Sequence, residues 1–245
     1  KAESFRVLFD LGKWEGILRS ARDLLRWGED HHNPQVEVTV LLTQAQVLLH
    51  RGRTDEAAAI QERLIGLARE IRDLQVLVPA LAIAALIELT EGRTRQAVVL
   101  VDELDLLTSP HHRWRARYLP MVVRVLVWAD QVDDAEKFMS GMAVRAARDQ
   151  HALLMGHAIV AEASGRIEKA CDLYREAASR WADYGFVLEE GQAHLGLARC
   201  LLALGDHVAV AEPLQRAGAI FKRLDARPLL DDVDRTSAQA TALTS

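Results

Sequence analysis

The sequence predicts an all-α fold, a right-handed α-solenoid of about six antiparallel helical hairpins. Half of the 245 residues are hydrophobic and only 5% are aromatic, a composition that favours helices over a β-sandwich. One turn sequence occurs twice in nearly the same form, as RGRTDEAA at residues 51–58 and as EGRTRQAV at residues 91–98. Apolar residues recur at helical spacing on both sides of this turn.

The turn repeats with a period near 40 residues. With its glycine as the reference position, equivalent turns lie at Gly12, Gly52, Gly92, Asp130, Gly165 and Gly205. Their intervals are 40, 40, 38, 35 and 40 residues, a range typical of stacked helical repeats. We therefore expect residues 1–245 to form a single solenoid domain, with residues 228–245 as a terminal helix and a fraying tail.

A helix is expected on each side of every turn. Five residues after the reference position stand Ile17, Ala57, Ala97, Ala135, Ala170 and Val210. Nine residues after it stand Ala21, Gln61, Val101, Met139, Tyr174 and Leu214. Seven residues before it stand Ala45, Ala85, Val123, Ala158 and Ala198, and four before it stand Leu48, Glu88, Leu126, Ala161 and Leu201. These offsets describe one face of each helix, so the unit is an αα-hairpin.

The glycine of the turn is explained by helix termination. Gly52 and Gly92 stand where the first helix of a hairpin must end in a left-handed residue. Thr54, with Asp55 and Glu56 behind it, is placed to cap the second helix and to complement its dipole. The same turn recurs because every hairpin needs it.

The start of the chain suggests a piece of a longer protein. The segment KAESFRVLF lacks an initiator Met and enters a helical pattern without an N-cap. An apolar terminal hairpin without a polar cap also predicts self-association, so we expect a homodimer through the first hairpin.

Charge and composition exclude several classes of function. A net charge of −5 and a pI near 6.0 argue against direct nucleic-acid binding by this segment. The apolar runs are too short to span a membrane, and no export signal opens the chain, so we expect a cytoplasmic protein. Cys171 and Cys200 lie 29 residues apart without metal-ligand spacing, and no cofactor motif is present.

The last repeat resembles the tetratricopeptide family. Residues 192–217, QAHLGLARCLLALGDHVAVAEPLQRA, carry a small residue at Ala198, the turn LGD from Leu204 to Asp206 and the apolar pair of Leu214 and Ala217. Similar signatures cover about 200 residues of the chain, although the period is longer than the family's repeat of about 34. Another departure is that Leu or His replaces the bulky aromatic residue expected early in the first helix.

The long, Arg-rich repeats are also similar to the sensor arrays of large bacterial regulators of the LuxR type, the STAND ATPases related to the maltose-regulon activator. This resemblance implies a non-enzymatic sensor that binds a ligand or a peptide and signals to an attached ATPase or output domain. A freestanding adaptor without a small-molecule ligand is the alternative.

Catalytic and metal-binding motifs are missing from the sequence. No P-loop, HExxH, GxSxG or Rossmann glycine fingerprint is present, so we expect no enzyme. A helical-repeat enzyme would need paired carboxylates in the groove, where only Glu162 is expected. The histidine pairs at residues 31–32 and 111–112 fall in links between hairpins and are interpreted as exposed loop residues, not as a metal site.

A ligand site is predicted on the first helices of the hairpins. Arg117 and Arg124 are seven residues apart and point the same way from one helix, and Arg199 occupies the position equivalent to Arg124. A guanidinium in an apolar groove seeks an anionic partner. We therefore expect an acidic peptide or an anionic small molecule to bind Arg117, Arg124, Trp128, Gln192 and Arg199. The alternative is that these arginines form ion pairs with Glu162, Glu189 or Glu190 across neighbouring hairpins.

Overall fold

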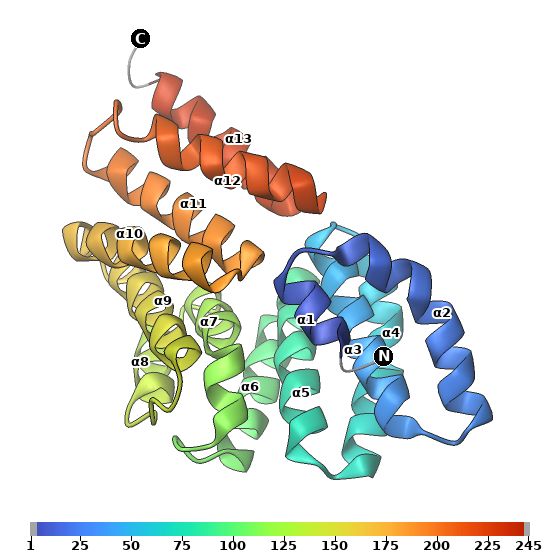
Figure 1. The fold of residues 1–245 in the computed structure, drawn as a ribbon. Helices are drawn as coiled ribbons and strands as arrows, with labels where there is room; N and C mark the ends of the chain where they lie inside the picture. Colours follow the sequence, from blue (N-terminus) through green and yellow to red (C-terminus); the bar gives the residue numbers. More distant parts are fainter. Residues whose placement is uncertain (1–3, 243–245) are drawn as a thin grey trace. The chain divides into compact units, whose positions relative to one another are not determined.

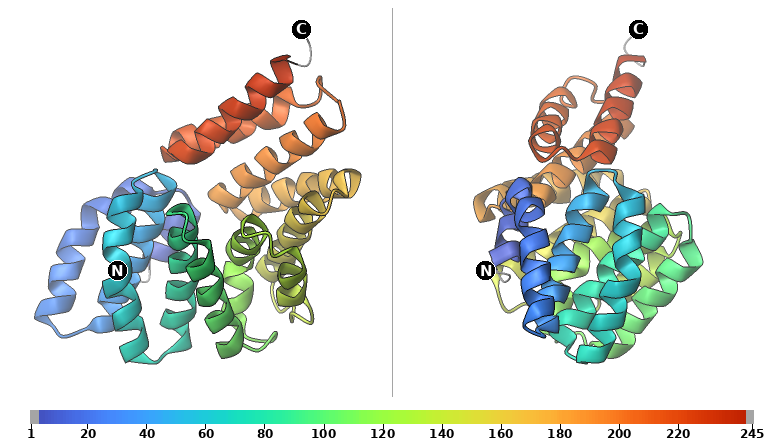
Figure 2. Two further views of the ribbon diagram at one scale, coloured as in Figure 1. Left: turned by 180° about the vertical axis from the view of Figure 1, so that it is seen from behind. Right: turned by 90° about the vertical axis from the view of Figure 1, so that its right-hand side faces the viewer.

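The computed structural model describes residues 4–242, and all regular secondary structure in that range is α-helical (Figures 1 and 2). The predicted all-α class is therefore confirmed. The helices are α1 (Ser4–Asp10), α2 (Trp14–Asp30), α3 (Pro34–His50), α4 (Thr54–Ile71), α5 (Leu74–Thr90), α6 (Thr94–Leu107), α7 (Arg113–Trp128), α8 (Val132–Met139), α9 (Ala147–Ala163), α10 (Ile167–Tyr184), α11 (Val187–Ala203), α12 (Ala211–Leu224) and α13 (Arg227–Ala242).

Each hairpin closes through the same hydrogen-bonded turn. After α3, Gly52 has a φ of 75° and the N–H of Arg53 donates to the carbonyl oxygen of Leu48 at 2.9 Å. This six-residue bond is the Schellman termination, which requires a left-handed residue at the glycine position. The same pairing follows Gly12, Gly92, Asp130, Gly165 and Gly205. The left-handed backbone is thus the physical reason for the repeated turn.

Thr54 does not act as the expected cap. It is the first residue of α4, and the preceding Arg53 makes no side-chain capping hydrogen bond. Asp55 and Glu56 do lie in the first turn of α4, where a carboxylate complements the helix dipole.

The chain divides into two compact units, Lys1–Ala143 and Val144–Ser245, which we call unit 1 and unit 2. Unit 1 carries α1 to α8, and unit 2 carries α9 to α13. Both are stacks of antiparallel hairpins, and each is described by itself below. A single solenoid domain over residues 1–245 stays a prediction.

Helix α5 is the centre of unit 1. Every residue from Val76 to Glu88 is buried, so α5 is covered on all sides and not on one stripe only. Small residues at the repeated positions permit this packing, because Ala85 of α5 and Ala97 of α6 are fully buried and let two backbones approach closely. Helix α3 is nearly as enclosed from Glu37 to Leu49.

Unit 2 is built around α10 and α11. Gly196 of α11 lies directly against the ring of Tyr174, and Gly191 lies against Phe221 of α12, so both glycines make room for an aromatic ring. Helix α13 continues to Ala242, farther into the tail than expected, because Val233 and Thr236 are buried against the unit. The end of the predicted tail, residues 243–245, lies outside the described residues.

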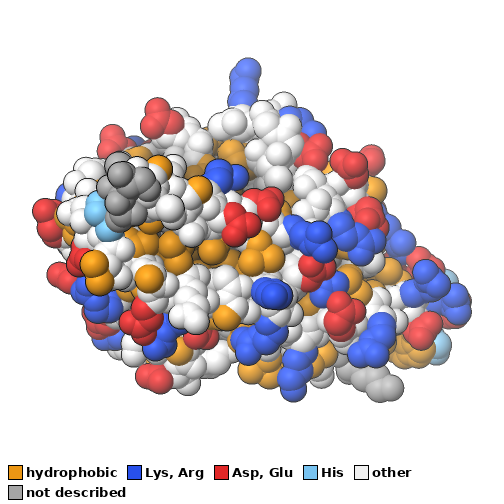
Figure 3. Space-filling model, turned by 90° about the horizontal axis from the view of Figure 1, so that it is seen from above, with side chains coloured by type: hydrophobic (Ala, Val, Ile, Leu, Met, Phe, Trp, Pro, Cys, Tyr) orange, Lys and Arg blue, Asp and Glu red, His pale blue; other side chains and the backbone are white. Residues whose placement is uncertain are grey.

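The described surface carries charge of both signs. Lys and Arg side chains are interspersed with Asp and Glu on the face drawn in Figure 3. Within residues 4–242, no helix is long and apolar enough to cross a membrane.

Candidate functional site

Three of the five predicted ligand-binding residues lie on α7 in unit 1. Arg117 donates from Nη2 to Oδ2 of Asp10 at 2.8 Å, and only 14% of its side chain is exposed. Trp128 is the last residue of α7 and is 61% exposed. The anionic partner expected for Arg117 is therefore supplied by the chain itself, from the end of α1.

Arg124 follows Arg117 by seven residues on the same face of α7, and it lies near His50 at the end of α3. Burial, helped by the positive charge of Arg124, lowers the pKa of His50 to about 4. The imidazole also packs on Trp14, with ring centroids 5.9 Å apart, and its Nε2 atom is buried without a hydrogen-bond partner. His50 is consequently neutral at pH 7, and it presents an uncharged ring beside Arg124.

The other two predicted residues, Gln192 and Arg199, lie on α11 in unit 2. Arg199 makes a bidentate ion pair with Glu162 of α9. Its Nε donates to Oε1 at 2.6 Å, and its Nη2 donates to Oε2 at 2.8 Å. Tyr174 donates its hydroxyl to the same carboxylate at 2.6 Å. Arg199 thus forms the inter-hairpin pair with Glu162 that the sequence left open as the alternative.

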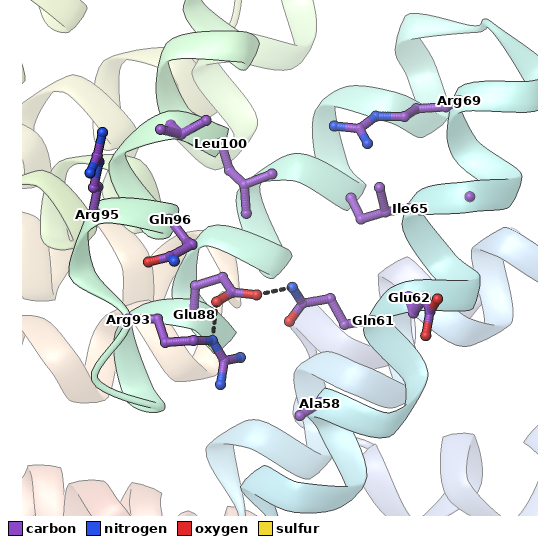
Figure 4. A pocket seen from close by; sticks show the side chains of 12 residues that line it. Ala58, Gln61, Glu62, Ile65, Arg69, Glu88, Arg93, Arg95, Gln96 and Leu100 are labelled. Carbon is purple, nitrogen blue, oxygen red and sulfur yellow. Dashed lines mark hydrogen bonds and ion pairs between the residues drawn. The ribbon is translucent and has the colours of Figure 1, made fainter.

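A groove lies between α4 and α6 in unit 1 (Figure 4). Its volume is about 850 Å³, which is large enough for several side chains of a peptide. The apolar part of its wall comes from Ala58, Ile65, Val99 and Leu100. The polar part comes from Gln61, Glu62, Arg69, Glu88, Arg93, Arg95 and Gln96.

The polar floor of this groove is one connected network. Glu88 of α5 accepts hydrogen bonds from Nε2 of Gln61 and from Nε of Arg93 (Figure 4). The bond from Arg93, which outweighs the opposing effect of burial, holds the pKa of Glu88 below its ordinary value. The second amide atom of Gln61, Oε1, is buried without a hydrogen-bond partner. The floor therefore holds an ionised carboxylate between two donors, while the Oε1 atom of Gln61 is itself closed off by burial.

The sequence contained a signal for this groove that site prediction missed. Gln61 breaks the apolar series nine residues after the turn, and Glu88 breaks the one four residues before it. A polar residue at a buried position needs a partner, and these two are hydrogen-bonded to each other across neighbouring hairpins. The sequence could therefore have predicted a contact between Gln61 and Glu88, because each is a polar residue at an otherwise apolar position of adjacent repeats.

No metal centre emerges from the described part of the chain, where no three His, Cys, Asp or Glu side chains gather in a metal-binding group. Cys171 and Cys200 are both buried free thiols, and burial raises the pKa of Cys200 to about 12.

The repeated hairpin with its left-handed turn defines the class of fold, an α-solenoid of helical hairpins. Among solved structures, the chain is similar to a tetratricopeptide repeat protein from Parabacteroides merdae, with 11% identity, 95% of this chain and 93% of that chain covered, and a TM-score of 0.49. It is also similar to the TPR2AB domain of yeast Sti1 in a complex with pHSP90, with 14% identity, 93% and 99% coverage and a TM-score of 0.40. No family model and no curated protein matches the chain.

Proposed function

We propose that the chain is a non-enzymatic interaction module that binds a peptide segment of a partner protein in the groove between α4 and α6. The observation that carries this proposal is the groove itself, which joins an apolar wall to a row of charged and amide side chains. Peptide recognition uses this combination, because apolar side chains supply affinity and backbone N–H groups fix the register.

The groove assigns a role to each of its walls. Ile65, Val99 and Leu100 receive apolar side chains of the peptide, and 56% of Val99 is exposed for this contact. Glu62, Arg95 and Gln96 are exposed along the same groove, and they hydrogen-bond polar groups of the peptide.

A display library of random peptides selected on the full chain tests the proposal. We expect enriched sequences whose binding is weakened at least about tenfold by Val99→Glu, because the new charge would be buried by the peptide. Val208→Glu is the matched control, since Val208 is 90% exposed and lies outside the groove. Selection that enriches no peptide, or peptides that bind both variants equally, would contradict the proposal.

The regulatory setting is a finer part of the proposal. The resemblance to the sensor arrays of LuxR-type STAND regulators favours a cytoplasmic regulator in which the module controls an attached ATPase or output domain. The freestanding adaptor is the alternative. The complete gene decides between them, because an ATPase module encoded with this segment supports the regulator and a gene that encodes the repeats alone supports the adaptor.

An anionic effector at Arg124 is a second candidate, favoured by the half-buried position of Arg124 beside a neutral His50. Trp128 would complete this site on α7. Arg117 and, on α11 of unit 2 with Gln192, Arg199 would bind an anion only by exchanging Asp10 and Glu162 for it. We expect Arg124→Ala to weaken effector binding about tenfold while leaving the melting temperature nearly unchanged. A large drop in melting temperature with unchanged binding would assign Arg124 a structural role only.

A further inference from the structure

The groove between α4 and α6 carries charged side chains on both of its walls, and most of these charges are already paired within the chain. Arg69 of α4 makes a bidentate ion pair with Glu103 of α6, in which Nη2 donates at 2.6 Å and Nε at 3.3 Å. Arg93 donates to Glu88 in the network of the floor. These charges are neutralised by one another, so they contribute little to the recognition of a charged partner.

Two charged residues of the groove have no such partner. Arg95 of α6 and Glu62 of α4 are both exposed, and neither makes an ion pair with another residue in the range 4–242. They come from the two opposite walls of the groove (Figure 4). The groove therefore has one unpaired cation on its α6 wall and one unpaired anion on its α4 wall.

The start of α6 adds to the positive charge of its wall. This helix begins at Thr94, next to Arg95, and it has neither an acidic residue in its first turn nor a side-chain hydrogen bond at its N-cap. The first N–H groups of a helix form the positive end of its dipole, which favours a nearby carboxylate. In α4 the same end is already complemented by Asp55 and Glu56. An acidic side chain of a bound segment is consequently attracted to the α6 wall.

Apolar side chains lie beside these two charges. Ile65 of α4 and Val99 and Leu100 of α6 line the same groove, and 56% of Val99 is exposed. A segment that covers them excludes water from the groove, and opposite charges attract more strongly where the surroundings are less aqueous. Burial of an apolar side chain thus reinforces the pairing of charges at the two walls.

We propose that the groove selects a partner segment with charges of both signs. An acidic side chain of this segment pairs with Arg95, a basic one pairs with Glu62, and an apolar one between them packs on Val99. The inference rests on the proposed function, the binding of a peptide segment in this groove, and it names the chemistry of that segment. A segment with two acids or two bases meets a like charge at one wall and binds more weakly.

Selection of one peptide display library on charge variants of the full chain tests the assignment. On the wild type we expect enriched peptides in which an acid and a base flank an apolar residue. Arg95→Glu makes both walls negative, so the acid of the enriched peptides should give way to Lys or Arg. Glu62→Arg makes both walls positive, so the base should give way to Asp or Glu.

Two exposed residues of α2 supply the matched controls. Arg22→Glu and Asp23→Arg change the charge by the same amounts outside the groove, and selections on them should keep the wild-type pattern. Equal melting temperatures of all four variants and the wild type would show that the folded chain is being compared in each selection.

One peptide enriched on the wild type then gives the size of the effect. Fluorescence anisotropy should show that it binds Arg95→Glu about five- to tenfold more weakly, because an attraction between exposed charges becomes a repulsion. Replacing the acid of this peptide by Lys should restore its binding to Arg95→Glu and weaken its binding to the wild type.

The outcomes separate this inference from the proposed function. Enriched peptides without a charge preference, or with a preference that Arg95→Glu and Glu62→Arg leave unchanged, overturn the inference. If such peptides still lose binding with Val99→Glu, the interaction function stands and only the charge assignment falls. A selection that enriches no peptide removes both.

Discussion

At the scale of single residues, the buried polar side chains decide where this repeat array departs from a plain apolar stack. Arg115 of α7 is the extreme case, with 3% exposure. Its guanidinium donates to the carbonyl oxygen of Phe138 at 2.8 Å and to that of Thr108 at 3.1 Å, and it pairs with Asp105 at 2.6 Å. This one side chain joins the end of α6, the start of α7 and the end of α8.

Arg115→Ala should lower the free energy of unfolding by about 2 to 4 kcal/mol, because it strands two buried carbonyl groups. The ion pair adds little, since 53% of the Asp105 side chain is exposed. Urea unfolding followed by circular dichroism measures the loss. Arg95→Ala is the control, since Arg95 is exposed and such substitutions stay within about 0.5 kcal/mol. Equal effects of the two substitutions would show that Arg115 is not a structural link.

His50 predicts an acid-sensitive stability. Its pKa is about 4 in the folded chain and 6.5 in the reference state, so between these values the unfolded state binds more protons. Stability is therefore complete above pH 6.5 and declines as the pH falls toward 4, by about 3 kcal/mol for this residue. Unfolding curves from pH 7.5 to 4 should show a smaller decline for His50→Gln than for the wild type. Parallel declines would assign the acid sensitivity to other groups.

At the scale of the helix and its turns, one of the repeated turns has a non-glycine residue at the left-handed position. Asp130 holds a φ of 60°, which glycine adopts with less strain than aspartate does. Asp130→Gly should raise the free energy of unfolding by several tenths of a kcal/mol. Gly92→Ala, at a φ of 77° with open space around it, should lower it by about 1 kcal/mol through backbone strain alone. The same sign for both substitutions in thermal unfolding would contradict this explanation of the turn.

Two helical glycines make a second matched pair. A Cβ atom at Gly196 would lie 2.5 Å from the ring of Tyr174, whereas one at Gly66 meets nothing within 4 Å. Gly196→Ala should therefore destabilise by about 1 to 3 kcal/mol through overpacking. Gly66→Ala should stabilise by up to about 1 kcal/mol through helix propensity. Differential scanning calorimetry reports both, and a stabilising Gly196→Ala would mean that α10 and α11 are not in close contact.

The elements differ in how far sequence alone could predict them. The hairpin turns were predictable because their requirement is local, a left-handed residue at Gly52 or Gly92. The enclosure of α5 was not predicted, although the run from Val76 to Ile87 has no polar face and so signals a helix covered on every side. The Asp10 partner of Arg117 was missed for another reason. It comes from 107 residues away, and no spacing in the sequence encodes that contact.

At the scale of the whole molecule, the five predicted site residues are divided between the two units, and a site that joins all five stays a prediction. Three belong to unit 1 and two to unit 2, and sequence offsets treat all hairpins as equivalent when their surroundings differ. Arg199 has its acid on the preceding first helix, whereas the acid of Arg117 comes from the first helix of the chain. Within unit 1, the central claim is that α5 forms an axis enclosed on all sides from Val76 to Glu88.

Hydrogen exchange of the full chain, resolved by residue, tests this claim most directly. Exchange protection reports the free energy of local opening, and a helix with one face in solvent opens more readily than an enclosed one. We predict that amides from Leu81 to Ile87 of α5 exchange slowest among residues 4–143, and more slowly than those of α6, where Val99 and Leu106 are exposed. Protection of α6 equal to that of α5 would contradict the account.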